Sequence, residues 1–173
     1  GIVREVGEGV TAFTKGQHVV ATMGFGSHAE VISVPAAAVW AVPAGLSLQE
    51  AAGIPIEFGT ADDCLFEFGR LKAGESVLIQ AGASGVGLAA IQLAKAAGAT
   101  VFATASSDER LERLKEYGLD HGINYTKVDA AKEVLALTNG AGVNLVVDSV
   151  GGSTLEGSVA MLAYRGRISW VGR

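Results

Sequence analysis

A glycine-rich turn between two apolar segments constrains this 173-residue chain more than any other feature. The apolar run over residues 77–80 predicts a buried strand, and an apolar pattern with helical spacing follows the turn. Gly82, Gly85 and Gly87 allow a sharp reversal and close packing of the helix on the strand, and they leave the helix amino terminus open to a phosphate. Ser84 stands at the second glycine of the plain GxGxxG pattern. A dinucleotide-binding turn is our interpretation, and a tight turn that binds nothing is the alternative.

Strand and helix patterns alternate along the second part of the chain. Such alternation predicts an α/β fold with a doubly wound parallel sheet of Rossmann type. Five strands are expected, where a complete dinucleotide-binding fold has six. The expected strands are 77–80, 100–104, 122–124, 144–148 and 167–171, and the expected helices are 86–97, 108–117, 130–137 and 155–164.

Short apolar runs divided by turn residues occupy the chain up to about Pro43. They predict short strands of a small β-rich domain at residues 2–6, 18–22, 28–34 and 39–42. A helix is predicted over 47–69, beginning at a capping box of Ser47 and Glu50. We therefore expect three parts, namely residues 1–46, a bridging helical segment over 47–71, and a dinucleotide-binding domain over 72–173 that lacks its last strand. The chain opens inside one apolar run and stops after another, so we expect a fragment.

The residues after the second strand of the alternating part bear on the choice of cofactor. NAD-specific folds place Asp or Glu there, about 20 residues beyond the turn. This chain has Ala105 instead, followed by Ser106 and Arg110, which can donate to a 2′-phosphate. NADPH is the predicted cofactor. The alternative is that Ser106 merely caps the next helix, in a box with Glu109, and that Arg110 is a solvated charge.

Composition and charge exclude several kinds of partner. With 49% apolar and 18% charged residues, the chain is globular rather than disordered. The net charge of −5, with Lys and Arg scattered, argues against nucleic acid and membrane surfaces as partners. Cys64 is the single cysteine, and His18, His28 and His121 lack the spacing of metal ligands. We expect no metal site and a cytoplasmic location.

Several short motifs beside the glycine turn are typical of one enzyme family. They are residues 1–3, 6–10, 51–55, 59–61, 69–75, 123–125 and 148–152. Through them the chain resembles, over essentially its whole length, the zinc-independent quinone oxidoreductases, the zeta-crystallin-like branch of the medium-chain dehydrogenases/reductases. The resemblance implies part of a GroES-like substrate domain followed by a Rossmann domain that binds NADPH.

The resemblance also implies a set of cofactor contacts. These are Ser84, Gly85, Val86 and Gly87 at the turn, Ser106, Arg110 and Tyr125 around the 2′-phosphate, and Thr60, Gly172 and Arg173 near the nicotinamide. From the residues alone, Tyr125 is equally an ordinary strand-end aromatic, and Thr60 an interior helix residue that bonds a preceding carbonyl.

Zinc enzymes of the same superfamily carry a four-cysteine lobe where this chain runs directly to Gly24, Gly26 and His28. Their third catalytic ligand falls near Ile56, which has no donor atom. The resemblance therefore implies an enzyme with neither zinc site.

We expect an NADPH-dependent oxidoreductase that transfers hydride to quinones or other conjugated carbonyls without metal or flavin. The sequence assigns no catalytic residue. The alternatives are an enoyl-thioester reductase unit of a polyketide or fatty-acid system, and a non-catalytic NADPH-binding protein. The complete protein is expected to be a homodimer with a small-molecule substrate. The 173 residues alone are expected to be inactive, because the nicotinamide cleft would be incomplete.

Overall fold

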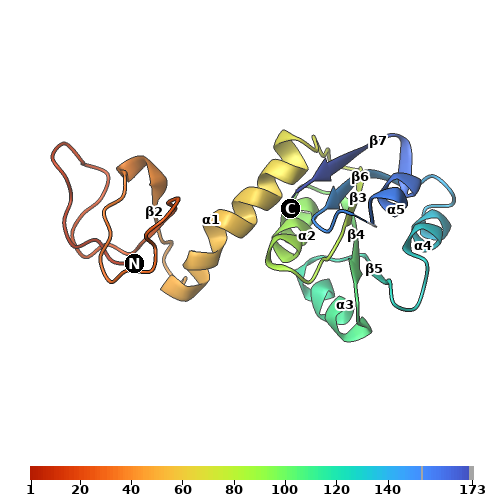
Figure 1. The fold of residues 1–173 in the computed structure, drawn as a ribbon, viewed down its shortest axis with the longest axis horizontal. Coiled ribbons are helices and arrows are strands. Elements are labelled where there is room, and N and C mark those ends of the chain that lie inside the picture. The colour runs from red at the N-terminus through yellow and green to blue at the C-terminus, as the bar shows by residue number, and fades with distance from the viewer. Residues whose placement is uncertain (153, 172–173) are drawn as a thin grey trace. The chain divides into compact units, whose positions relative to one another are not determined.

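The computed structural model describes residues 1–152 and 154–171, and the chain divides into two compact units (Figure 1). The first unit is Gly1–Glu57 and the second is Phe58–Arg173. The division falls inside helix α1 (Leu48–Asp62), so this helix begins in one unit and ends in the other.

The first unit consists mainly of short strands and turns. Strand β1 (Val19–Ala21) pairs antiparallel with β2 (Val39–Ala41), and a 3-10 turn, η1 (Ala36–Ala38), leads into β2. The prediction of strands at 18–22 and 39–42 is thus confirmed, whereas residues 2–6 contribute one isolated bridge from Ile2 to His18. The strand predicted over 28–34 is wrong. Those residues form bends and coil, since no other strand of the described residues pairs with them and a strand needs a bonded neighbour.

Helix α1 begins at the predicted capping box. The Ser47 N–H donates to Glu50 Oε2 at 2.9 Å, and the Glu50 N–H donates to Ser47 Oγ at 3.2 Å. These bonds satisfy two amide donors that a helix start would otherwise leave unpaired. After α1 the chain continues in a wider π-helical turn, η2 (Asp63–Glu67), and reverses at Arg70, whose φ is 51°.

The second unit contains a five-stranded parallel sheet in the order β5-β4-β3-β6-β7 (Figure 1). The chain enters at the central strand β3, moves outward to β5, and then crosses back to β6 and β7, which is the doubly wound order. The predicted Rossmann-type sheet is confirmed. Its elements are β3 (Ser76–Ile79), α2 (Gly85–Ala96), β4 (Thr100–Ala105), α3 (Asp108–Leu114), η3 (Lys115–Tyr117), β5 (His121–Asn124), α4 (Ala130–Leu137), β6 (Val143–Asp148), α5 (Thr154–Ala160) and β7 (Leu162–Trp170).

Both faces of this sheet are buried. Val77 and Ile79 belong to one apolar cluster with Ile91 of α2. Leu78, between them in the strand, belongs to a second cluster with Val134 of α4. Burial on both faces is why the strands appear in the sequence as continuous apolar runs instead of alternating ones.

The end of α5 and the start of β7 differ from prediction. The helix expected over 155–164 stops at Ala160, and β7 begins at Leu162 instead of residue 167. Leu162 pairs with Val143 and Arg167 pairs with Leu145, so residues 163–166 bulge opposite a single residue of β6. Such an irregularity depends on the register with the neighbouring strand, which the local sequence does not contain.

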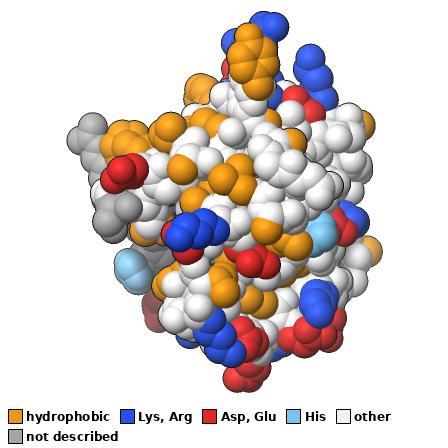
Figure 2. Space-filling model, turned by 90° about the vertical axis from the view of Figure 1, so that its right-hand side faces the viewer, with side chains coloured by type: hydrophobic (Ala, Val, Ile, Leu, Met, Phe, Trp, Pro, Cys, Tyr) orange, Lys and Arg blue, Asp and Glu red, His pale blue; other side chains and the backbone are white. Residues whose placement is uncertain are grey.

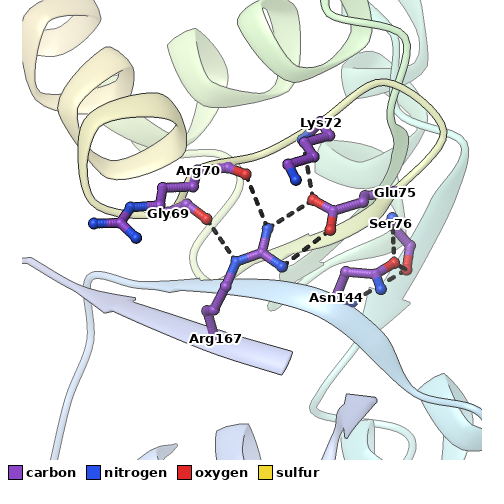
Figure 3. A network of polar contacts seen from close by, with 7 residues as sticks. All are labelled: Gly69, Arg70, Lys72, Glu75, Ser76, Asn144 and Arg167. Carbon is purple, nitrogen blue, oxygen red and sulfur yellow. Dashed lines mark hydrogen bonds and ion pairs between the residues drawn. The ribbon is translucent and has the colours of Figure 1, made fainter. Parts of the chain in front are cut away.

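A polar network joins β7 to the segment that precedes β3 (Figure 3). The Arg167 guanidinium donates to Glu75 Oε1 at 3.0 Å and Oε2 at 2.6 Å, and its Nε donates to the Gly69 carbonyl at 2.7 Å. Beside it, Asn144 Oδ1 accepts from the Ser76 N–H at 2.9 Å and from the Ser76 hydroxyl at 3.0 Å. These contacts lie at the end of the sheet opposite to the glycine turn.

The surface carries charges of both signs. On the face shown in Figure 2, basic and acidic side chains are interspersed with exposed apolar ones. None of the described helices has both the length and the apolar character needed to cross a membrane.

Candidate functional site

A cavity of about 530 Å³ opens at the carboxyl ends of the parallel strands. Doubly wound sheets bind ligands at this edge, near the point where the strand order reverses, and the volume suits a small-molecule or cofactor site. Its walls come from the ends of strands, from the glycine turn, and from residues of α3, α4 and α5 or the loops before them. The lining residues are Gln80, Ala81, Ala83, Ser84, Thr104, Ala105, Ser106, Arg110, Tyr125, Asp129, Ala130, Ala131, Val150, Thr154, Gly157 and Met161.

Two glycines of the turn are required by packing. A Cβ atom on Gly82 would lie 2.6 Å from the Cβ of Ala103, and one on Gly87 would lie 2.5 Å from the Ala81 carbonyl oxygen. Both distances are far shorter than atoms tolerate, so α2 can approach the sheet this closely only with glycine at these positions. Ala81 itself takes a left-handed conformation, with φ of 52°.

The start of α2 borders the cavity through Ala83 and Ser84, whereas the predicted contacts Gly85, Val86 and Gly87 are not among the lining residues. Ser84 caps the helix, and its Oγ accepts from the Gly87 N–H at 3.1 Å. Among the described residues, the Gly85 and Val86 N–H groups donate no hydrogen bond. Ser84 and Gly85 are exposed, and the first turn of α2 has no acidic side chain to offset the positive end of the helix dipole. This end of the helix can therefore receive an anion.

The end of β4 offers a hydroxyl and no carboxylate to the cavity. Ala105 is buried, and Ser106 is exposed in the cavity wall. The alternative that Ser106 caps α3 is wrong, because Ser107 is the cap and its Oγ accepts from the Arg110 N–H at 3.3 Å. Ser107 has the extended backbone that a cap requires, with φ of −146° and ψ of 147°. The Ser106 hydroxyl is thus available to a ligand.

Arg110 and Tyr125 line the same cavity from α3 and from the end of β5. Both are exposed, and no carboxylate of the described residues lies within ion-pair distance of the Arg110 guanidinium. The nearby Asp108 is engaged elsewhere, since hydrogen bonds from Lys127 and Asn124 hold the pKa of its carboxyl below the ordinary value. The charge of Arg110 is therefore free to pair with an anionic ligand.

Asp129 is a cavity residue that sequence reasoning missed. Its Oδ1 accepts from the N–H groups of Ala131 at 3.0 Å and Lys132 at 3.2 Å, so the carboxylate caps α4. Reasoning from the sequence also missed Val150, Thr154 and the rest of the α5 side. Polar residues at the ends of the predicted strands could have indicated this side of the cavity, because the carboxyl ends of parallel strands meet at one edge of the sheet.

Thr60, which is predicted near the nicotinamide, does not line this cavity. Thr60 lines a second cavity of about 360 Å³, together with Cys64, Ser169 and Trp170. Cys64 is buried there, and burial raises the pKa of its thiol. Gly172 and Arg173 lie outside the described residues. Within residues 1–152 and 154–171, no group of three His, Cys, Asp or Glu side chains is arranged to hold a metal ion.

Comparison with known proteins places the chain in a family. Residues 85–173, which include the start of α2 and the cavity strands that follow, match the family described as zinc-binding dehydrogenase. The chain belongs to this family. The resemblance to medium-chain dehydrogenases/reductases is thereby confirmed, although the family name does not imply zinc in this chain.

Two curated relatives match nearly the whole chain. Phthioceranic/hydroxyphthioceranic acid synthase of Mycobacterium tuberculosis is 37% identical over 173 residues, which are 100% of this chain and 8% of the synthase. Quinone oxidoreductase-like protein 2 of Rattus norvegicus is 36% identical over 173 residues, which cover 99% of this chain and 49% of the rat protein.

Solved structures confirm the fold. The CurK enoyl reductase is 37% identical with a TM-score of 0.88, and the match covers 100% of this chain and 52% of that one. Escherichia coli quinone oxidoreductase complexed with NADPH is 33% identical with a TM-score of 0.87, and the match covers 97% of this chain and 52% of that one. The chain thus spans about half the length of these two structures and of the rat relative.

Proposed function

We propose that this chain carries the NADPH-binding domain, and part of the substrate domain, of an oxidoreductase that reduces quinones or other conjugated carbonyls without metal or flavin. Membership of the dehydrogenase family supports oxidoreductase chemistry. One observation carries the cofactor assignment. Ser84 at the start of α2, the exposed Ser106, and Arg110, which has no ion-pair partner among the described residues, line one cavity.

The diphosphate of the cofactor fits the glycine turn. The Gly85 and Val86 N–H groups are free to donate to phosphate oxygens, and the α2 dipole favours negative charge beside them. Ser84 and Gly85 are exposed and small, so a phosphate can approach the backbone closely. Val86 and Gly87 complete the first turn of α2, where Gly87 keeps the helix against the sheet.

The 2′-phosphate of NADPH fits the end of β4. Ser106 and Tyr125 offer hydroxyl donors, and Arg110 offers a planar guanidinium that matches phosphate oxygens. Ala105 stands where NAD-specific folds have a carboxylate for the ribose hydroxyls. NADPH is therefore proposed over NADH.

Thr60, Gly172 and Arg173 are the proposed contacts of the nicotinamide. Bound NADPH supplies a hydride from nicotinamide C4. The residues of this chain bind and orient the cofactor, and the buried Ala105, Thr104 and Gln80 form part of the cavity wall. No residue of this chain is assigned a proton-transfer role.

The cofactor assignment is tested by calorimetric titration of the 173-residue chain with NADPH and NADH. We expect NADPH to bind more tightly. Arg110→Ala should weaken NADPH binding by about tenfold to a hundredfold, the range for a charge-assisted phosphate contact, and leave NADH binding unchanged. Arg113→Ala is the matched control, because Arg113 lies on the same helix, is exposed, and does not line the cavity. Equal affinities for NADPH and NADH in the unmodified chain would refute the assignment.

An enoyl-thioester reductase is the second candidate function. It is favoured by the 37% identity to the mycobacterial synthase over all 173 residues and by the likeness to the CurK enoyl reductase. The protein produced from the complete gene should be assayed for NADPH oxidation with a benzoquinone and with a crotonyl thioester. Faster turnover of the thioester would favour the second candidate. NADPH binding without turnover of either substrate would favour a non-catalytic binding protein and refute both enzymatic proposals.

A further inference from the structure

A continuous chain of buried hydrogen bonds crosses the sheet beneath the cavity. The Ser158 hydroxyl donates to Asp148 Oδ2 at 2.8 Å, and Gln80 Nε2 donates to Ser158 Oγ at 3.3 Å. The Thr104 hydroxyl donates to Gln80 Oε1 at 2.7 Å, and the Ala81 N–H donates to Thr104 Oγ1 at 3.2 Å. All four side chains are buried, with 6% or less exposed. This series of hydrogen bonds thus connects the end of β6, through α5, to the glycine turn.

The direction of every bond follows from Asp148. This carboxylate also accepts from the Val150 N–H at 3.0 Å and the Gly151 N–H at 2.8 Å. Burial raises the pKa of Asp148, but the bonds from Gly151, Ser158 and Val150 outweigh it and hold the pKa below the ordinary value. The group is therefore ionised at neutral pH and can only accept.

Because Asp148 can only accept, each of the following groups has only one possible assignment of donor and acceptor. Ser158 must donate its single hydroxyl hydrogen to Asp148, so it presents a lone pair to Gln80. Gln80 then turns its NH₂ group to Ser158 and its carbonyl to Thr104. The Thr104 hydroxyl donates its hydrogen to Gln80, so its oxygen can only accept from the Ala81 N–H.

Ala81 is the residue of the turn that this arrangement holds. Its φ of 52° is a left-handed conformation that a residue with a side chain rarely adopts. Thr104 binds two consecutive N–H groups of the turn. Its hydroxyl accepts from the Ala81 N–H, and its carbonyl accepts from the Gly82 N–H at 2.9 Å. The Ala81 carbonyl in turn accepts the Ser84 N–H at 2.9 Å, which places the cap of α2.

We propose that Asp148 is a positioning residue for the dinucleotide, which acts through Ser158, Gln80 and Thr104 to hold the glycine turn in the shape that receives the diphosphate. The inference rests on the proposed function, because it needs a dinucleotide in the cavity. Asp148 and Ser158 do not line the cavity, so neither touches the ligand there. Their influence is exerted on the glycine turn, where the diphosphate would bind, and not on Ser106 and Arg110, where the 2′-phosphate would bind.

The test compares two ligands, NADPH and adenosine 2′-monophosphate, with the 173-residue chain. The second ligand lacks the diphosphate and probes only the Ser106 and Arg110 end. Ser158→Ala and Thr104→Val should each weaken NADPH binding by about tenfold and leave binding of the monophosphate within twofold of the unmodified chain. Thr104→Ser keeps the hydroxyl and should restore NADPH binding. Amide exchange at Ala81, followed by NMR, should be faster in Ser158→Ala.

Non-additivity tests whether the residues act as one chain. The double variant Ser158→Ala with Thr104→Val should bind NADPH no more weakly than Thr104→Val alone, because the link to the turn is already broken. Thr138→Val is the control for general loss of stability. It removes a hydroxyl that accepts the Gly142 N–H at 2.9 Å, outside the cavity, and should leave the NADPH affinity unchanged.

The outcomes separate this inference from the proposed function. If the unmodified chain binds neither NADPH nor the monophosphate, the proposed function fails. If it binds NADPH but Ser158→Ala changes neither the affinity nor the Ala81 exchange, the positioning role fails alone. Equal losses for both ligands, or single effects that add in the double variant, would mean that the network merely stabilises the sheet and would also overturn the inference.

Discussion

Removal of the Arg167 guanidinium should destabilise the second unit by an amount that the structure allows us to bracket. In Arg167→Met the apolar stem is kept, but four hydrogen bonds are lost, two of them to Glu75 and one each to the Gly69 and Arg70 carbonyls (Figure 3). The side chains of Arg167 and Glu75 are 30% and 21% exposed, so the pair lies between a surface and a buried ion pair.

The expected loss is about 2–3 kcal/mol. Exposed ion pairs contribute about 0.2–1 kcal/mol, whereas breaking a fully buried pair costs about 3–5 kcal/mol. The buried Gly69 carbonyl also loses a charged donor, which adds about 1 kcal/mol. The double variant Arg167→Met with Glu75→Gln should lose less than the two single variants together, because no unpaired charge is left.

Urea unfolding at pH 7 measures this loss. The chain has two tryptophans, and a Trp40→Phe background leaves the fluorescence of Trp170 in β7 as a probe of the second unit alone. The free energy of unfolding should fall while the urea dependence stays constant. A loss below about 0.5 kcal/mol would refute the reasoning and place the pair in the surface class.

The loss should also depend on pH. Hydrogen bonds from Arg167, opposed by burial, hold the pKa of Glu75 below its ordinary value of 4.5. A carboxyl whose folded pKa is depressed contributes stability that is present above the unfolded pKa and lost as the pH falls through the folded pKa. The difference between the unmodified chain and Arg167→Met should therefore narrow as the pH falls below 4.5. A constant difference down to the acid limit of folding would contradict this assignment.

The exposed Gly85 and the buried Gly87 of the turn should respond differently to substitution. Gly85→Val should abolish NADPH binding in calorimetry while the far-UV circular dichroism stays unchanged, because Gly85 is exposed at the start of α2 where the backbone must approach a phosphate; retained binding would refute the diphosphate assignment. Gly87→Ala should instead lower the free energy of unfolding by more than about 2 kcal/mol, because its Cβ would meet backbone at 2.5 Å; a urea midpoint equal to that of the unmodified chain would contradict the packing role.

Local sequence patterns predicted a structural feature correctly where all the residues that determine it lie within one segment. The Ser47 cap, the glycine turn and the succession of strands and helices along the chain all follow from residues close together in sequence. The prediction failed where two neighbours satisfy the same rule. Ser106 and Ser107 are both good caps, and only the backbone dihedrals of the folded chain select Ser107.

The sequence by itself determined the parallel Rossmann-type sheet, the glycine turn and the absence of a carboxylate at the end of β4, because these depend on residue type and local spacing. Tertiary structure alone decided which distant residues meet at the carboxyl edge of the sheet. Strand order brings Thr104 and Asp148 onto one buried chain of hydrogen bonds, and register with β6 makes β7 bulge before Arg167. Neither outcome is encoded within a single segment, because each depends on how separate strands pair.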